Sequence, residues 1–412
     1  MIAVAALAMG LALVTSIAWR SAWAPAIGAL AGVAVALVGG AAGRDDLAHA
    51  LSDVWRPLIV IVAVMATSAC AAELGVFARL ASWIEPYTRG PVRHAFRVTF
   101  LISAVTAAVL SNDAAILLVT PVVLDLLRAV YPKRNPKFVV PFAFATFVAA
   151  GVAPLPTGNP MNLVVTARAG IDFHAYAIHM IPVAIAGWAA AYAALAWCFR
   201  GVLADEAPAL GAAPPVVRLG RPARIVLAVT AASIASYPVL ALGGLRPWVV
   251  AAPAAIIAVT VARTAGVPLR RVAAGVSWEL VPFVFGVLVL ATALARAGAT
   301  SALAGLYAAS PAPLPTVGGV AAVGSALANN HSVALVHSIA LAGAPDRLIY
   351  AALVGGDLGP RLLPIGSLAG LLWLHALRRA DVHLPLGTFV RVGAVVTIPS
   401  LAISLAVLWL VT

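Results

Sequence analysis

The sequence predicts an all-α polytopic membrane protein with two inverted repeats, about ten spanning helices (two of them broken) and two re-entrant hairpins. Three observations support this fold class. The 412 residues are 63% hydrophobic and only 10% charged, whereas soluble domains carry about 25% charged residues. Apolar runs recur along the chain at the length of about 20 residues that crosses a bilayer. Basic residues gather in alternate connections between these runs.

The apolar runs divide into spans and longer, interrupted stretches. The spans cover residues 2–19, 22–42, 58–78, 138–170, 176–199, 223–243, 246–264, 280–297, 348–377 and 388–411. The stretches 95–130 and 299–345 are too long for one span, and a polar cluster interrupts each of them. We therefore expect each stretch to enter and leave the membrane on the same side, as a re-entrant hairpin.

The basic residues favour this hairpin interpretation. With ten spans and two hairpins, most of the 26 basic residues fall on one side of the membrane. They are Arg20 and the residues of this type within 79–97, 128–137, 200–224, 263–271 and 378–391. The positive-inside rule makes this side cytoplasmic, so both termini are predicted to be periplasmic. Counting either hairpin as a single span would distribute the basic residues more evenly over the two sides of the membrane.

The same assignment predicts two repeats of opposite orientation. Residues 1–200 and 223–412 each contain three spans, a hairpin, a broken span and a final span. A proline-rich cytoplasmic linker, residues 201–222, joins them. Inverted repeats with broken helices at the bilayer midplane are the build of many secondary transporters.

The most informative stretch runs from Gly355 to Ser367 and reads GGDLGPRLLPIGS. Its prolines and glycines break a helix, and its two charged residues lie inside an apolar run. Asp357 and Arg361 are four residues apart, so in a helix they would share a face and pair. We interpret both as proton-coupling residues. The alternative is a structural kink with a self-neutralising charge pair.

A matching break lies in the first repeat, where Pro156-x-Gly158-Asn159 has the pattern of Pro364-x-Gly366-Ser367. Two breaks at corresponding repeat positions are the best sequence pointer to a transport site. Polar side chains and freed backbone groups would line that site. The substrate-binding residues predicted here are Thr157, Gly158, Asn159, Asn162, Gly366 and Ser367.

The polar hairpin tips are expected to face the same site. We predict that Ser111, Asn112, Asn329 and Asn330 bind substrate and that Asp113 carries protons. Capping of the outgoing helix explains Ser111 equally well. It explains Asp113 less well, because a carboxylate at the bilayer centre costs about 2.5–3.5 kcal/mol that an uncharged cap avoids.

Three other residues are more ambiguous. Glu73 is close enough to Arg79 to reach toward the membrane interface, and we favour this explanation over a functional role. His331 either titrates near neutral pH or is a satisfied interior histidine. His337 is interpreted as a packing residue.

Several function classes find no support in the sequence. The net charge of +12 comes with no basic stripe or nucleic-acid motif. Two cysteines, Cys70 and Cys198, indicate neither a disulfide framework nor a thiolate metal site. No Gly-rich phosphate loop ending in Lys and Ser/Thr occurs, so the chain itself is not expected to use ATP. We predict no catalytic residue and no cofactor.

The residues from Gly356 to Ala369 (GDLGPRLLPIGSLA), followed by LLWLH, resemble the ArsB-type arsenite/antimonite efflux permeases of the ion transporter superfamily. Asn112-Asp113-Ala114-Ala115 is similar to the first hairpin of that family. Glu73-x-Gly75-x-Phe77 is similar to the end of its third span. The chain departs from the family at His331-Ser332 in the second hairpin tip. It also departs at the first break, which is closer to other anion permeases of the superfamily.

The resemblance implies a secondary active transporter, not an enzyme, that exports arsenite or antimonite across the bacterial inner membrane. We predict that it does so in exchange for protons, and the resemblance allows a separate ATPase subunit. The alternative is a sodium- or proton-coupled anion transporter, in which Arg361 binds negative charge directly. An intramembrane aspartyl protease using Asp113 and Asp357 is disfavoured, because it leaves the repeats unexplained.

We expect Asp113→Asn to abolish coupled transport while leaving an assembled protein, because the amide keeps the shape of the side chain but carries no exchangeable charge. Arsenite tolerance of a sensitive host, read beside the amount of membrane-inserted protein, measures the effect. A fully active variant would remove Asp113 from the mechanism.

Overall fold

A computed structural model describes residues 23–76, 90–109, 112–131, 135–205, 218–242 and 248–412, with single residues 7, 10, 11, 21, 79, 82 and 86. This part of the chain is helical and contains no β-strand. The predicted all-α class is therefore confirmed. The first predicted span, residues 2–19, lies mostly outside the described residues, as does most of the predicted linker 201–222.

The helices follow one another with short connections. The first half contains α2 (Ala24–Val38), α3 (Arg44–Glu73), α5 (Val92–Val109), α6 (Asn112–Val130), α7 (Asn135–Ala149), α8 (Pro160–Ala169), α9 (Phe173–Cys198) and α10 (Arg200–Leu203). The second contains α11 (Arg221–Leu242), α12 (Trp248–Thr264), α13 (Leu269–Ala274), α14 (Leu280–Arg296), α15 (Ala299–Ala309), α16 (Pro313–Ala328), α17 (Asn330–Ala340), α18 (Asp346–Leu358), α19 (Leu368–Arg379) and α20 (Leu386–Val411). Within the described part of the chain, three 3-10 turns interrupt this series: η1 (Pro156–Gly158), η2 (Gly359–Arg361) and η3 (Pro364–Gly366).

Within the described residues, four helical segments are long and apolar enough to cross a membrane. They are Val54–Glu73, Val92–Val109, Phe173–Cys198 and Leu386–Val411. The segment Val92–Val109 is α5, the first arm of the predicted hairpin 95–130, and at 18 residues it is about 27 Å long. This arm therefore has the length of a full span, and the re-entrant course of the hairpin stays a prediction.

The helix α3 begins well before the apolar run 58–78 that predicted it. Asp45 and Asp46 lie in its first turn, where negative charge is favourable at a helix N-terminus. Asp46 also accepts a hydrogen bond from the backbone N–H of Gly43 at 2.7 Å and pairs with Arg296 at 2.7 Å. Hydropathy alone does not predict this first part of α3, because its residues are polar. Capping and an ion pair to α14 stabilise it instead of apolar burial.

Both predicted breaks are present, and the turns at their centres share one backbone conformation. The turn η1 lies between the extended residues Leu155 and Asn159, and η3 lies between the extended residues Leu363 and Ser367. Proline excludes the helical conformation from the residue before it, which explains the extended backbone of Leu155, Asn159 and Leu363. The matching sequence patterns thus form matching turns.

Each broken helix restarts with a side-chain cap. Oδ1 of Asn159 accepts a hydrogen bond from the backbone N–H of Met161 at 3.1 Å, at the start of α8. Oγ of Ser367 accepts one from the N–H of Gly370 at 3.0 Å, at the start of α19. These caps satisfy amide groups that a helix start leaves unpaired. The inverted relation of the two halves as wholes remains a prediction.

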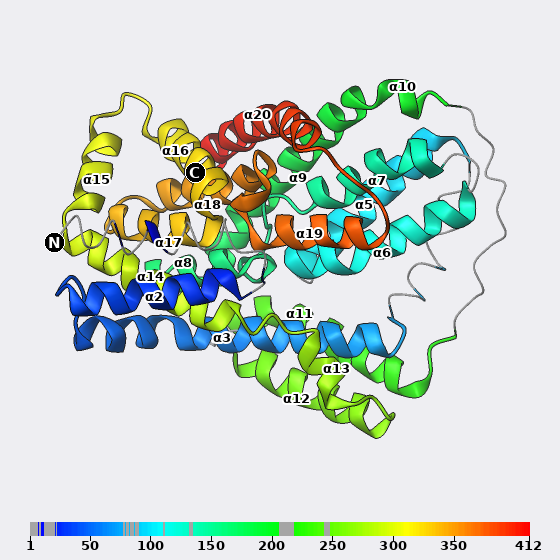
Figure 1. Cartoon of the computed structure of the whole chain (residues 1–412), viewed down its shortest axis with the longest axis horizontal. Helices are drawn as coiled ribbons and strands as arrows, with labels where there is room; N and C mark the ends of the chain where they lie inside the picture. Colours follow the sequence, from blue (N-terminus) through cyan, green and yellow to red (C-terminus); the bar gives the residue numbers. More distant parts are fainter. Residues whose placement is uncertain are drawn as a thin grey trace.

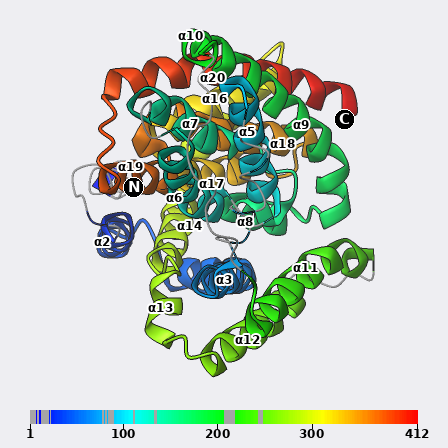
Figure 2. The same cartoon turned by 90° about the vertical axis from the view of Figure 1, so that its right-hand side faces the viewer.

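The elements of the two predicted hairpins lie toward opposite ends of the molecule. Figure 1 shows α5 and α6 in the right part of the view and α15, α16 and α17 in the left part. The arms of each pair, α5 with α6 and α16 with α17, pack on each other. In Figure 2, α3, α11, α12 and α13 lie below the bulk of the helices, and α20 runs along the top. The broken helices lie between these groups.

The second break packs closely on α16 through glycines. A Cβ at Gly355 would collide with the backbone carbonyl oxygen of Gly318 and lie 2.8 Å from Cβ of Ala321. A Cβ at Gly359 would collide with the carbonyl oxygen of Ala322. Small residues of this kind let two helix backbones approach inside a membrane. The α16 helix therefore supports the second break directly.

We expect Gly355→Ala to destabilise the protein by about 1–3 kcal/mol, because the added methyl group overpacks the contact between α16 and α18. The melting temperature of the purified protein in detergent measures this loss. Gly319→Ala is the matched control, since nothing lies within 4 Å of a Cβ built there. Equal melting temperatures of the two variants would contradict the close packing.

Candidate functional site

Asp357 lies in the last turn of α18, with only 5% of its surface exposed. Its carboxylate accepts three hydrogen bonds, all from the first half of the chain. The donors are the backbone N–H of Ala153 at 3.0 Å, Nδ2 of Asn159 at 2.6 Å and Nδ2 of Asn162 at 3.1 Å. Hydrogen bonds to a charged acceptor are roughly twice as strong as neutral ones. Asp357 therefore joins the second broken helix to the first.

Tyr176 of α9 completes this network. Nδ2 of Asn162 donates to the Tyr176 hydroxyl at 2.8 Å, and that hydroxyl donates to the carbonyl oxygen of Ala153 at 2.8 Å. Both side chains are fully buried. Oδ1 of Asn162 has no hydrogen-bond partner among the described residues. Sequence analysis missed Tyr176, because a tyrosine in an apolar span is most simply explained by packing.

Arg361 does not form the predicted ion pair with Asp357. The α-helix ends at Leu358, and Arg361 belongs to the 3-10 turn η2. A spacing of four residues therefore no longer puts both side chains on one face. Nη2 of Arg361 instead donates to the carbonyl oxygen of Val148.

The remaining nitrogens of Arg361 are unusual for a buried cation. The residue is 2% exposed, yet Nε and Nη1 have no hydrogen-bond partner within the described part of the chain. A Cβ at Gly151 would lie only 2.5 Å from Nη2, so the absence of a side chain at Gly151 makes room for the guanidinium. Buried charges are ordinarily paired and fully hydrogen-bonded. Arg361 thus has donors available to a further group.

The hairpin tips also reach the broken helices. Nδ2 of Asn112 donates to the carbonyl oxygen of Gly151 at 3.0 Å, just before the first break. In the second hairpin, Asn329 caps α17 by accepting from the N–H of His331 at 3.0 Å. Asn330 is buried and lies 2.9 Å from Nδ1 of His331. The α17 helix, which begins at this second tip, packs on α8.

Among the described residues, the predicted site residues Gly366 and Ser367 make no hydrogen bond to Asp357. Ser111 lies outside the described residues, and Asp113 lies in the first turn of α6 with a side chain that is also outside them. Gly366 is near the carbonyl oxygen of Ser325, which would be 2.9 Å from an added Cβ. Ser367 acts as the cap of α19.

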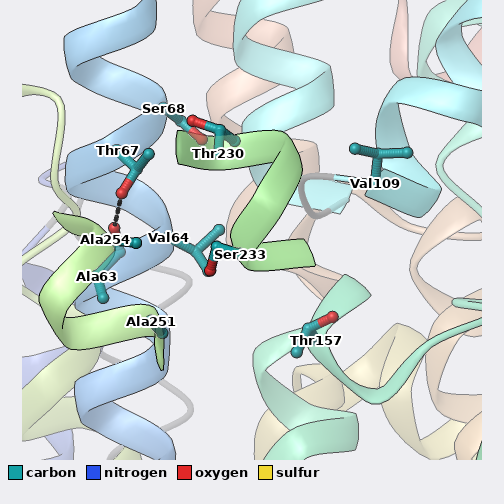
Figure 3. A pocket seen from close by; sticks show the side chains of 10 residues that line it. All are labelled: Ala63, Val64, Thr67, Ser68, Val109, Thr157, Thr230, Ser233, Ala251 and Ala254. Atoms are coloured by element: carbon teal, nitrogen blue, oxygen red, sulfur yellow. Dashed lines mark hydrogen bonds between the residues drawn. The ribbon is translucent and has the colours of Figure 1, made fainter. Parts of the chain in front are cut away.

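Thr157 of η1 lines a separate small cavity between α3, α11, α12 and the end of α5, in which about 20 Å³ is open to the centre of a water-sized sphere (Figure 3). Four further hydroxyl side chains line it: Thr67, Ser68, Thr230 and Ser233. The rest of the lining is apolar: Ala63, Val64, Val109, Ala251 and Ala254. Sequence analysis missed the four hydroxyls. The only signal in the sequence was the presence of hydroxyl residues inside apolar spans. Such residues also occur when the hydroxyl simply bonds to the backbone of its own helix.

The ambiguous residues receive clearer explanations. Glu73 pairs with Arg271 at 3.3 Å near the surface, so its carboxylate lies away from the buried network. Nε2 of His337 lies 2.7 Å from the hydroxyl of Tyr307, in agreement with a packing role. Nε2 of His331 has no hydrogen-bond partner among the described residues, so this buried histidine is not a fully satisfied interior residue.

Thiols and metal-binding clusters play no visible part in this arrangement. Cys70 and Cys198 are both free. Nowhere in the described ranges do three or more His, Cys, Asp or Glu residues gather to hold a metal ion. The chemistry of the site is that of a carboxylate, amides, a guanidinium and hydroxyls.

The sequence profile of the family described as arsenical pump membrane protein matches residues 3–411. The chain belongs to this family. Members of the arsenical pump family are multi-pass membrane transporters, and the resemblance found at the second break is confirmed.

Individual relatives agree with this membership. An arsenical pump membrane protein of Escherichia coli K12 is 29% identical over 94% of this chain and 92% of its own length. The corresponding protein of Yersinia enterocolitica is 30% identical over 91% of both chains. An uncharacterized transporter of Mycobacterium tuberculosis is 27% identical over 93% of this chain and 92% of its own.

A solved structure shares the fold of this arsenical pump family member. It is the YdaH transporter of Alcanivorax borkumensis, with a TM-score of 0.58 over 88% of this chain and 86% of that chain. Sequence identity is 14%, so the likeness concerns the arrangement of helices alone.

We expect Asn159→Ala to lower the melting temperature more than the loss of a cap alone, because it also removes a donor to the Asp357 carboxylate. A hydrogen bond to a charged group contributes about 1.5–3 kcal/mol, and an N-cap contributes about 1 kcal/mol. Asp172→Ala is the matched control, since Asp172 caps α9 by accepting from the N–H of Ala175 at 2.9 Å and is exposed. Equal losses in the two variants would show that Asn159 contributes only as a cap.

Proposed function

We propose that the chain exports arsenite or antimonite across the inner membrane in exchange for protons, as a secondary active transporter. One observation carries this proposal: the buried carboxylate of Asp357 lies where the two broken helices meet, and every donor to it comes from the opposite half. Protonation would remove the negative charge and weaken all three hydrogen bonds together. Proton binding would thereby loosen the junction between the halves.

The solute chemistry agrees with the available side chains. Arsenite near neutral pH is the uncharged As(OH)3, which hydroxyls, amides and backbone groups can hydrogen-bond without thiols. The names of the Escherichia coli and Yersinia relatives support an arsenical as the cargo. Export of an uncharged molecule against its gradient requires a second, energy-yielding movement, which the proton supplies.

The magnitude of the driving force is sufficient. One proton moving through 100 mV supplies about 2.3 kcal/mol. Since 1.36 kcal/mol corresponds to a factor of ten, this supports a solute gradient of roughly 50-fold. A separate ATPase subunit would add energy but is not required. Periplasmic termini and a cytoplasmic 201–222 linker complete the proposed orientation.

A second candidate is a sodium- or proton-coupled anion carrier of the same fold. The observation that favours it is the buried Arg361, whose Nε and Nη1 are without partners among the described residues. An anionic solute would complete the hydrogen bonds of this guanidinium.

Everted membrane vesicles distinguish the two candidates. We expect acidification of the vesicle interior to drive arsenite accumulation, approaching 50-fold for a driving force of about 100 mV. Asp357→Asn should reduce accumulation to the level of vesicles without the protein. Size-exclusion chromatography of this variant is the control for assembly. Uptake of an anion that arsenite does not inhibit, without arsenite accumulation, would favour the anion carrier.

A further inference from the structure

The cavity of Figure 3 differs in chemistry from the Asp357 network. Its lining contains hydroxyl and apolar side chains, and none of its ten lining residues is charged or a cysteine. The hydroxyls come from elements far apart in the sequence: Thr67 and Ser68 from α3, Thr157 from η1, Thr230 and Ser233 from α11. The cavity therefore lies between one broken helix and the group formed by α3, α11 and α12.

We infer that this hydroxyl-lined cavity is the binding site of the transported solute, a small uncharged molecule with several hydroxyl groups. The inference rests on the proposed export of As(OH)3 and Sb(OH)3, and it assigns the solute and the proton to different places. It also moves solute binding away from Asn159 and Asn162, which the sequence pattern had suggested.

The first argument is that Ser68 is buried and unsatisfied. It is 5% exposed, and its Oγ has no hydrogen-bond partner among the described residues. An unsatisfied buried hydroxyl costs about 1–3 kcal/mol. A solute that hydrogen-bonds Ser68 recovers this cost on binding.

The second argument is that neighbouring hydroxyls are oriented as acceptors. Thr67 donates to the carbonyl oxygen of Ala63 at 2.8 Å, and Thr230 donates to that of Val226 at 2.7 Å. Each uses its single O–H within its own helix, and the lone pairs of its oxygen remain available. A trihydroxy solute brings three O–H donors, so it complements these acceptors. An anion without donors does not.

The third argument is that the amide nitrogens of the Asp357 network are already engaged. Nδ2 of Asn159 donates to Asp357, and Nδ2 of Asn162 donates to both Asp357 and Tyr176. A solute that accepted hydrogen bonds from these nitrogens would have to displace a charged acceptor. The cavity requires no such exchange.

The turn η1 links the two places. Thr157 lines the cavity, and two residues later Asn159 donates to Asp357 at 2.6 Å. Gly158 between them is packed against Ala153, whose Cβ would lie 3.0 Å from an added Cβ. A change in the hydrogen bond to Asp357 therefore reaches the cavity wall through one short turn. This connection explains how protons and an uncharged solute can be exchanged without sharing a site.

Substitutions in the cavity wall test the inference in the everted-vesicle assay. Ser68→Ala and Thr157→Val each remove one hydroxyl, and we expect each to raise the KM for arsenite about three- to tenfold, as the loss of one hydrogen bond predicts. Ala254→Leu fills the cavity and should abolish accumulation.

Ser103→Ala is the control for the hydroxyl variants, because Ser103 is buried, donates to the carbonyl oxygen of Thr99 and does not line the cavity. Ala252→Leu, on α12 outside the cavity lining, is the control for filling.

Competition identifies the solute class. Excess boric acid and glycerol, both uncharged and polyhydroxylated, should inhibit arsenite accumulation by the unaltered protein, whereas chloride and sulfate, which have no O–H donors, should not. Inhibition by the anions alone, or an unchanged KM in both Ser68→Ala and Thr157→Val, would overturn the inference. The hydroxyl variants decide the question even if Ala254→Leu fails to assemble. Absence of any proton-driven arsenite accumulation by the unaltered protein would instead overturn the proposed function, and the inference with it.

Discussion

The structure depends on one buried carboxylate that holds two halves of the chain together. Asp357 ends a helix of the second half, and Ala153, Asn159 and Asn162 of the first half supply its donors. A buried carboxylate without such donors would be costly, and a cluster of amides without an acceptor would be costly as well. Each half therefore satisfies polar groups of the other at this contact.

Close backbone packing makes this contact attainable. Glycines of the second break lie against α16, and Gly393 of α20 is so close to the carbonyl oxygen of Arg361 that no side chain fits there. Residues without side chains let non-helical backbone approach its neighbours, which is the condition under which broken helices persist at membrane depth. Arg361 then occupies the space beside Gly151, and its Nε and Nη1 have no hydrogen-bond partner among the described residues.

The arrangement separates charge from the hydroxyl-lined cavity. The carboxylate and the guanidinium are buried near the junction of the broken helices, while the cavity beside η1 is lined by hydroxyls and apolar groups. Thr157 and Asn159 belong to the same short segment, two residues apart. In the proposed mechanism this segment couples the proton to the solute without contact between them.

The sequence by itself determined the all-α class and the positions of both breaks, and it singled out Asn159 and Asp357 as candidate site residues. These follow from local physics: apolar run length, the exclusion of helix before proline, and side-chain caps act within a few residues. Only the tertiary structure decided that Asp357 binds Asn159 instead of Arg361, since a 3-10 turn replaced the assumed helix. It also decided that Tyr176 joins the network and that hydroxyls of α3 and α11 meet Thr157 in one cavity. Such contacts join residues far apart in the chain, and their partners are chosen by packing that no local pattern records.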